Sequence, residues 1–151
     1  GILLLFGASL MSLHALPKLG VKLTLILFVL IWVADIGAYV AGKNFGKHKL
    51  AKKVSPGKTI EGLMGGLLLS AVFGYFVALW LQQDWLYFVI AFPIIAGISV
   101  IGDLFASLLK RHGNIKDSGF LLPGHGGFLD RFDSLIAATP FYFAFVHYYS
   151  V

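Results

Sequence analysis

The chain has 151 residues, of which 58% are hydrophobic and only 13% are charged. Soluble domains carry about 25% charged residues, so this composition excludes an ordinary soluble domain and indicates a protein embedded in lipid. The sequence contains no cysteine, which excludes disulfide bonds and thiolate metal sites.

The first residues already belong to an apolar run. The sequence begins at Gly1 without an initiating methionine. A signal peptide or a single anchor does not explain apolar segments that recur along the whole chain. We therefore interpret residues 1–151 as the C-terminal membrane region of a larger protein, and we expect further membrane helices upstream.

The apolar segments have lengths that fit a lipid bilayer. A membrane-spanning helix needs about 20 mostly apolar residues, and lipid offers no partner to unpaired backbone groups, which excludes open strands. The sequence thus predicts an all-α, polytopic integral membrane protein with four full transmembrane helices and a partial one at the N-terminal end. The partial helix covers 1–16, and the full spans cover 21–42, 60–81, 86–106 and 134–151.

Small residues recur at every fourth position in two of these spans. Such a stripe lets the backbones of two helices approach closely. We interpret both stripes as packing seams and not as ligand sites. They consist of Gly62, Gly66, Ser70 and Gly74 in one span and of Ala34, Ala38 and Gly42 in another.

Two long basic loops, 43–59 and 107–133, connect the spans. Helices that alternate in direction place both loops on one side of the membrane, together with ten of the twelve basic residues. The positive-inside rule makes that side cytoplasmic. We therefore expect both loops to face the cytoplasm. The ten residues are Lys43, Lys47, Lys49, Lys52, Lys53, Lys58, Lys110, Lys116, Arg111 and Arg131.

Two aspartates interrupt the apolar spans near these loops. Asp35 precedes Lys43 by eight residues and Asp103 precedes Lys110 by seven. At a rise of 1.5 Å per residue, each acid lies roughly 10–12 Å from the first basic residue of its loop. An ionisable group at that depth normally faces a cavity or a partner. Pairing with a lysine from a neighbouring helix and a functional role both stay open for Asp35, whereas the charged loop after Asp103 favours function.

Two further acids stand at the predicted start of the last helix. Acids at that position complement the helix dipole and cap free amides, and this role alone could explain Asp133. Asp130 has a second use, because with Asp103 it brings two carboxylates from two helices to one point. Magnesium is usually held by one or two carboxylates together with water and substrate phosphates. We predict Asp103 and Asp130 as Mg²⁺ ligands, and the presence of a second cation is left open.

The PGHGG segment, Pro123 to Gly127, lies between Asp103 and Asp130 in the chain and has unusual backbone freedom. Glycine permits positive φ and lets an anion reach main-chain amides. On its own, such a segment is better explained by a tight turn. Basic residues on both sides favour a phosphate contact at Gly126 and Gly127. We also favour a hydrogen bond from His125 to phosphate over capping of a backbone carbonyl.

In the first loop, the SPGKTIEG segment is a more specific signal than the lysines alone. Ser55 and Pro56 predict a turn, after which Gly57 frees the backbone. Lys58 and Thr59 then resemble a phosphate-binding pair placed directly before a helix start. The segment is not a P-loop, because the GxxxxGK[ST] spacing is absent and no strand is predicted before it.

These motifs together resemble the signature of the phosphatidate cytidylyltransferase family, also called CDP-diacylglycerol synthase. That signature runs Ser, two residues, Lys-Arg, four residues, Lys-Asp, then a Pro-x-His-Gly-Gly turn and Asp-Arg-x-Asp. The stretch from Asp35 to Gly42, Phe45 with Gly46, and the SPGKTIEG segment are similar to the family's pattern too. The signature is matched at Ser107, Lys110, Arg111, Lys116, Asp117, Pro123, His125, Gly126, Gly127, Asp130, Arg131 and Asp133.

The resemblance implies a reaction in which CTP and phosphatidic acid, with magnesium, give CDP-diacylglycerol and pyrophosphate. In that family the acid of the GDLF-type segment and the acid of the Asp-Arg-x-Asp segment bind the metal, and they correspond to Asp103 and Asp130. With these two acids, we predict Lys110 and Lys116 as catalytic. The predicted substrate-binding residues are Asp35, Ser55, Lys58, Thr59, Arg111, Asp117, His125, Gly126, Gly127, Arg131 and Asp133.

Two alternatives belong to other functional classes. A transporter would explain intramembrane acids and small-residue seams, but transporters place their sites near the bilayer midplane, whereas the chemistry here gathers at one edge. A CTP-dependent lipid kinase would use a similar membrane architecture and transfer the γ-phosphate. The expected partners are the two substrates, CTP and phosphatidic acid, and membrane lipids. We expect no nucleic-acid partner, and the formation of a homodimer is left open.

Overall fold

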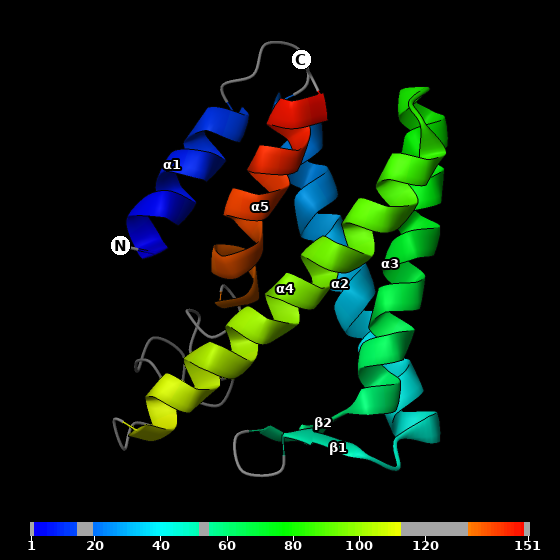
Figure 1. The fold of residues 1–151 in the computed structure, drawn as a ribbon, viewed down its shortest axis with the longest axis vertical. Coiled ribbons are helices and arrows are strands. Elements are labelled where there is room, and N and C mark those ends of the chain that lie inside the picture. The colour runs from blue at the N-terminus through cyan, green and yellow to red at the C-terminus, as the bar shows by residue number, and fades with distance from the viewer. Residues whose placement is uncertain (1, 15–19, 52–54, 113–132, 150–151) are drawn as a thin grey trace.

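A computed structural model describes residues 2–14, 20–51, 55–112 and 133–149 of the chain. This part consists of five helices and one small hairpin (Figure 1). In chain order the elements are α1 (Ile2–His14), α2 (Gly20–Phe45), β1 (Lys49–Ala51), β2 (Ser55–Thr59), α3 (Ile60–Leu81), α4 (Trp85–His112) and α5 (Asp133–Tyr149).

Three helices of the described part are long and apolar enough to cross a membrane: α2, α3, and α4 as far as Leu108. Only 39% of the most apolar stretch of α2 and 28% of that of α4 is buried inside the protein. Apolar surface of this extent is suited to lipid, so the chain is an integral membrane protein, as predicted. Helix α5 has 17 residues and is not among the three, so the count of four full spans stays a prediction.

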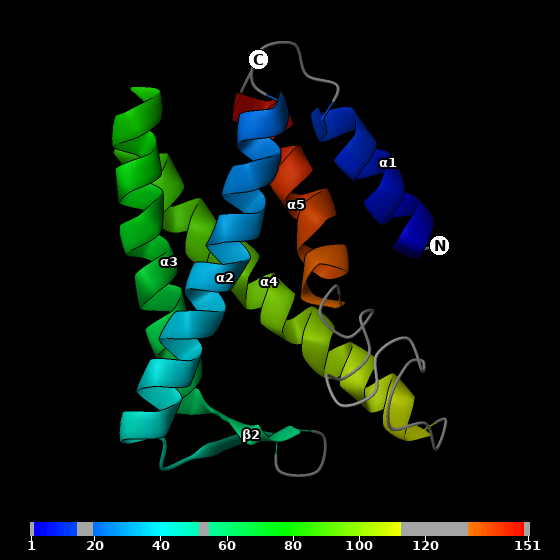
Figure 2. The ribbon, with the colours of Figure 1, turned by 180° about the vertical axis from the view of Figure 1, so that it is seen from behind.

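The helices form a bundle in which α2 and α3 lie side by side and α4 crosses them obliquely (Figures 1 and 2). Helix α5 packs on α4, and α1 packs on α5. The hairpin, the C-terminal end of α2 and the C-terminal end of α4 all lie at the same end of the bundle (Figure 1). The alternation of spans predicted this common side for the two connections.

The predicted small-residue stripe is the seam between α2 and α3. A Cβ atom on Gly66 would lie 2.8 Å from the carbonyl oxygen of Ala34, and one on Gly62 would lie 2.7 Å from that of Ala38. Such distances exclude any side chain unless the backbones move apart. Gly74, farther along the stripe, approaches a carbonyl oxygen of α4 in the same way, at 2.6 Å. The interpretation as a packing seam is confirmed, and the stripe serves two neighbouring helices.

The hydrophobic core lies between α2, α4 and α5. Leu27, Leu30, Phe92 and Tyr142 are fully buried in it. Phe92 packs against Tyr142 with ring centroids 6.4 Å apart and against Phe88 at 5.4 Å. This core engages the N-terminal half of α4, so that the C-terminal half of the helix extends toward the charged end of the bundle.

Three predictions about the connections were wrong. The chain is not purely helical, because β1 and β2 form an antiparallel pair in which Lys49 lies opposite Thr59 and Ala51 opposite Ser55. The segment from Ser55 to Thr59, where a turn was predicted, is therefore extended. The second loop begins later than position 107, because α4 continues to His112. Its final residues are good helix formers, and the end of an apolar span marks the edge of lipid, not the end of a helix.

The seam predicts the effect of adding a single methyl group. We expect Gly66→Ala to lower the free energy of unfolding by about 1–3 kcal/mol, the usual cost of overpacking, because the new Cβ meets backbone. Denaturant unfolding of the purified protein in detergent measures the loss. The matched control is Gly97→Ala, whose Cβ would meet only a Leu67 methyl group at 3.7 Å. An equal loss in both variants would contradict the seam.

Candidate functional site

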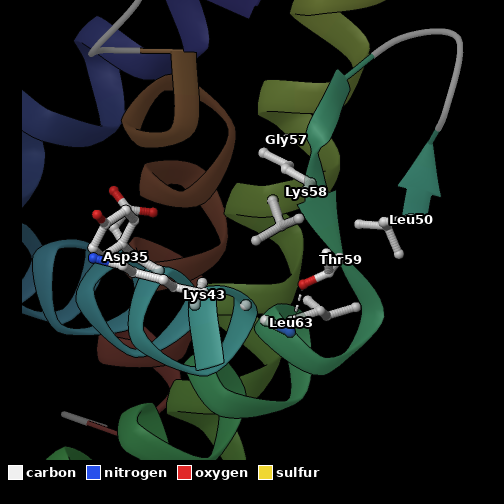
Figure 3. Close-up of a pocket in the computed structure, with 12 residues that line it drawn as sticks. Asp35, Lys43, Leu50, Gly57, Lys58, Thr59 and Leu63 are labelled. Atoms are coloured by element: carbon white, nitrogen blue, oxygen red, sulfur yellow. Dashed lines mark hydrogen bonds between the residues drawn. The ribbon is translucent and has the colours of Figure 1, made fainter. Parts of the chain in front are cut away.

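A pocket of about 340 Å³ lies between the C-terminal half of α2, the hairpin and the start of α3 (Figure 3). Its walls are mostly apolar, with a few polar and charged groups among them. It is lined by Asp35, Ala38, Tyr39, Gly42, Lys43, Leu50, Gly57, Lys58, Thr59, Gly62, Leu63 and Val100. Figure 3 shows Asp35 and Lys43 on α2, on the other side of the pocket from the strand that carries Lys58 and Thr59.

Thr59 fixes the junction between β2 and α3. Its backbone is extended, with φ −122° and ψ 156°, and its hydroxyl accepts a hydrogen bond of 3.1 Å from the backbone N–H of Gly62, dashed in Figure 3. Threonine at this position satisfies one of the free amides of the first helical turn. A Cβ on Gly42 would lie 2.9 Å from the Thr59 hydroxyl oxygen. The buried cap therefore fills space that the glycines of the seam leave open.

A second contact holds the hairpin against the start of α3. The Glu61 carboxylate accepts from the backbone N–H of His48 at 3.2 Å and contacts the His48 Nδ1 atom at 2.7 Å. The backbone N–H of Ile60 donates to the carbonyl of His48 at 2.9 Å. An acid in the first helical turn also complements the helix dipole. Sequence reasoning missed this pair of contacts between His48 and Glu61, although an acid just after the predicted helix start was its visible signal.

Lys58 leaves the hairpin to form an ion pair with Asp103 of α4. The side chains are 30% and 28% exposed, so neither charge is fully hydrated. Asp35 of α2 lies close enough to both groups for their charges to act on it. One ammonium group and two carboxylates from three separate elements thus gather beside the pocket. For Asp103, the sequence favoured a functional role over pairing with a lysine; the structure shows such a pairing, with a lysine that comes from a strand and not from a helix.

At this cluster, the carboxylates of Asp35 and Asp103 are the groups that could bind a metal ion. Among residues 2–14, 20–51, 55–112 and 133–149, no group of three or more histidine, aspartate or glutamate side chains could hold a metal ion. The second metal ligand predicted from the sequence, Asp130, lies outside those ranges. The metal prediction is therefore untested.

The other predicted site residues are distributed as follows. Ser55 begins β2 and pairs with Ala51. Lys110 and Arg111 lie in the last turns of α4, and α5 begins at Asp133; for these three residues the description covers the helical backbone alone. The predicted residues outside the described ranges are Lys116, Asp117, His125, Gly126, Gly127, Asp130 and Arg131.

The pocket rim includes residues that sequence reasoning did not assign to a site. The Lys43 ammonium lies over the ring of Tyr39, 5.8 Å from its centroid, and both line the pocket. Their separation of four residues on a helix was the available signal. Leu50 and Val100 come from β1 and α4 and add apolar wall. The arrangement offers cations for phosphate oxygens, carboxylates for a metal ion, and an apolar wall beside both.

The chain was compared with protein families and with curated proteins. The family model described as the cytidylyltransferase family matches residues 2–149. A phosphatidate cytidylyltransferase of Haemophilus influenzae is 47% identical over 133 residues, which are 83% of this chain and 46% of that protein. One of Pseudomonas aeruginosa is 46% identical, covering 81% of this chain and 46% of that protein. The chain spans about half the length of the curated relatives it matches.

The fold also resembles that of a solved structure. That structure is of an intramembrane enzyme for archaeal membrane lipids biosynthesis, and it aligns with a TM-score of 0.58 and 26% sequence identity. The alignment covers 79% of this chain and 75% of that one. The similarity supports the intramembrane arrangement of the helices.

The cap at the start of α3 predicts a difference between two small substitutions. Thr59→Ala removes the hydroxyl that accepts from Gly62 and should lower the free energy of unfolding by about 1 kcal/mol. Thr59→Ser keeps the hydroxyl and should recover most of that loss. Denaturant unfolding in detergent measures both. If the serine variant were as unstable as the alanine variant, the methyl packing and not the cap would hold this junction.

Proposed function

The chain belongs to the cytidylyltransferase family, and on that premise we propose that the whole protein transfers the cytidylyl group of CTP to phosphatidic acid. The products are CDP-diacylglycerol and pyrophosphate. Curated relatives named phosphatidate cytidylyltransferase support this activity. The observation that carries it is the cluster of Lys58, Asp103 and Asp35 beside a pocket at the basic end of a membrane bundle. The kinase and transporter alternatives gain no support from these relatives.

The donor set at this cluster fits a hard divalent cation. Asp103 supplies a partly exposed carboxylate, with that of Asp35 nearby, and Mg²⁺ prefers such oxygen ligands. We propose that Asp103 and Asp130 would hold the ion. Asp130 lies outside the residues that the structure describes. Bound there, Mg²⁺ supplies positive charge that offsets the negative charge of the CTP phosphates.

The residues of the chain act by binding and orienting two phosphate-bearing substrates. The phosphate of phosphatidic acid has a second pKa of about 6, so it is anionic near neutral pH and can serve as the nucleophile itself. Its oxygen would bond to the α-phosphorus of CTP as the bond from that phosphorus to the bridging oxygen breaks and pyrophosphate leaves. No side-chain nucleophile is needed. Positioning and charge neutralisation supply the acceleration.

Basic side chains provide that positioning. Lys58 lines the pocket and would bind a phosphate of one substrate. We propose the same role for the other predicted cations, and for the glycines of the PGHGG segment as amide donors to phosphate. Because the pocket lies at the basic end of the bundle, we place it at the cytoplasmic face of a bacterial inner membrane. At that level, water-borne CTP and a lipid headgroup can meet. The other cations are Lys110, Arg111, Lys116 and Arg131.

A transfer assay tests the proposed activity. Membranes that contain the full-length protein receive phosphatidic acid, Mg²⁺ and CTP labelled at the α- or the γ-phosphate. We expect the α-label alone to enter lipid, because the cytidylyl group carries the α-phosphorus. Entry of the γ-label would identify a lipid kinase and overturn the proposal. Absence of both labels from lipid would overturn it as well.

Substitution of the two proposed metal ligands tests the mechanism separately. We expect Asp103→Asn and Asp130→Asn each to lower the rate of α-label transfer by about two orders of magnitude or more, the usual cost of losing one electrostatic contact to the reacting phosphates. Membrane insertion should be unchanged. The control is Asp84→Asn, in which the acceptor oxygen for the N–H of Leu86 is retained. Substantial activity in either ligand variant would exclude that acid as a metal ligand.

A further inference from the structure

The ion pair between Lys58 and Asp103 occupies a carboxylate that the proposed function assigns to a metal ion. Both side chains are about 30% exposed, at 30% and 28%, so solvent screens their attraction only in part. Asp35 feels the charges of both partners. Without a cation between them, two neighbouring carboxylates would repel each other. Lys58 is therefore the counter-cation of Asp103, and its charge also acts on Asp35.

The backbone of Lys58 is fixed, whereas its side chain is long. Thr59, the next residue, caps α3 and is buried, and the strand is paired through Thr59 and Ser55. The ammonium group stands on a flexible four-carbon stem. Lys58 lines the pocket while its ammonium group pairs with Asp103 outside the pocket lining. The side chain can thus exchange one anionic partner for another without movement of the hairpin.

From this geometry we propose that Lys58 competes with the divalent metal ion for the carboxylate of Asp103, and releases it when a nucleotide phosphate enters the pocket. The inference rests on the proposed function. A metal ion beside Asp103 repels the ammonium group, and expulsion of Lys58 without a new partner leaves an unpaired, partly buried charge. A phosphate group provides that partner. Metal and nucleotide therefore favour each other's binding, and by linkage the effect is reciprocal.

Such a contact serves a purpose at a membrane surface. An enzyme with a permanently occupied metal site would hold a concentrated positive charge next to anionic lipid headgroups. A site in which Lys58 stays paired with Asp103 until the nucleotide arrives does not bind lipid phosphate alone. The Lys58 ammonium group then has two partners, the Asp103 carboxylate before the nucleotide binds and a nucleotide phosphate afterwards. Its movement from the first to the second frees Asp103 for the metal ion.

Manganese binding to the full-length protein in detergent, without nucleotide, tests the competition directly. Mn²⁺ replaces Mg²⁺ as the probe, because the electron paramagnetic resonance signal of free Mn²⁺ reports the bound fraction. We expect Lys58→Met to bind Mn²⁺ about tenfold more tightly than the unaltered protein, within the usual range of coupling between sites. Lys58→Arg keeps the charge and should bind like the unaltered protein. A CTP analogue, measured in EDTA, should bind more weakly to Lys58→Met.

The matched control is Lys43→Met, which removes another pocket lysine whose ammonium group lies over Tyr39. Mn²⁺ affinity should change far less in this variant. An equal gain in both variants, or no gain in Lys58→Met, overturns the inference. Where Lys58→Met does not fold, Lys58→Gln replaces it and must show the same gain. The extra thermal stability that Mn²⁺ confers gives a second readout and should be larger for the Lys58 variant.

The α-label transfer assay on the same preparations separates this inference from the proposed function. Transfer by the unaltered protein, combined with equal Mn²⁺ affinities, overturns the competition alone. Tighter Mn²⁺ binding by Lys58→Met, without any transfer by the unaltered protein, overturns the cytidylyl transfer and leaves the competition standing.

Discussion

The arrangement of this site depends on the ion pair between Lys58 and Asp103. Asp103 belongs to a helix that is otherwise apolar enough to cross a membrane, and a carboxylate in such a helix is costly without a partner. The partner arrives from a short strand and not from another helix. The pair therefore joins the hairpin to α4, and one wall of the pocket follows from that junction.

The position of Lys58 depends in turn on how closely α2 and α3 pack. Gly62 and Gly66 let the two backbones come almost into contact, and Thr59 caps α3 in the space beside Gly42. Because Lys58 directly precedes that cap, the seam determines the point from which its side chain reaches Asp103. The same few residues therefore determine both the packing of α2 against α3 and the position of Lys58. A change in the seam would shift Lys58 at the site.

Sequence reasoning succeeded where one physical constraint dominates. Lipid requires long apolar helices, and the span predicted at 60–81 coincides with α3. The four-residue spacing of small side chains identified the seam, and the charge of Asp103 marked it as a group in need of a partner. The helix start after Thr59 followed from the beginning of the apolar span, whereas the capping role of Thr59 was not predicted. These features are local, or they reflect the solvent that surrounds the whole chain.

The features that were missed depend on contacts between distant parts of the chain. The strands of the hairpin are three and five residues long, too short for an alternating pattern, and they are stable only through their pairing and the contacts between His48 and Glu61. The ion pair joins residues 45 positions apart, which no local pattern reveals. The roles assigned to residues 113–132 rest on the family resemblance and stay predictions.

The most direct test of the central claim is a double-mutant cycle between Lys58 and Asp103. Unfolding of Lys58→Met, Asp103→Asn and the double variant would be measured on the full-length protein in detergent, without metal or nucleotide. Each single change leaves a partly buried group unpaired, so we predict a double variant that is less destabilised than the sum of the two by about 1–3 kcal/mol. Losses that add to within about 0.5 kcal/mol would contradict a structural ion pair at this position.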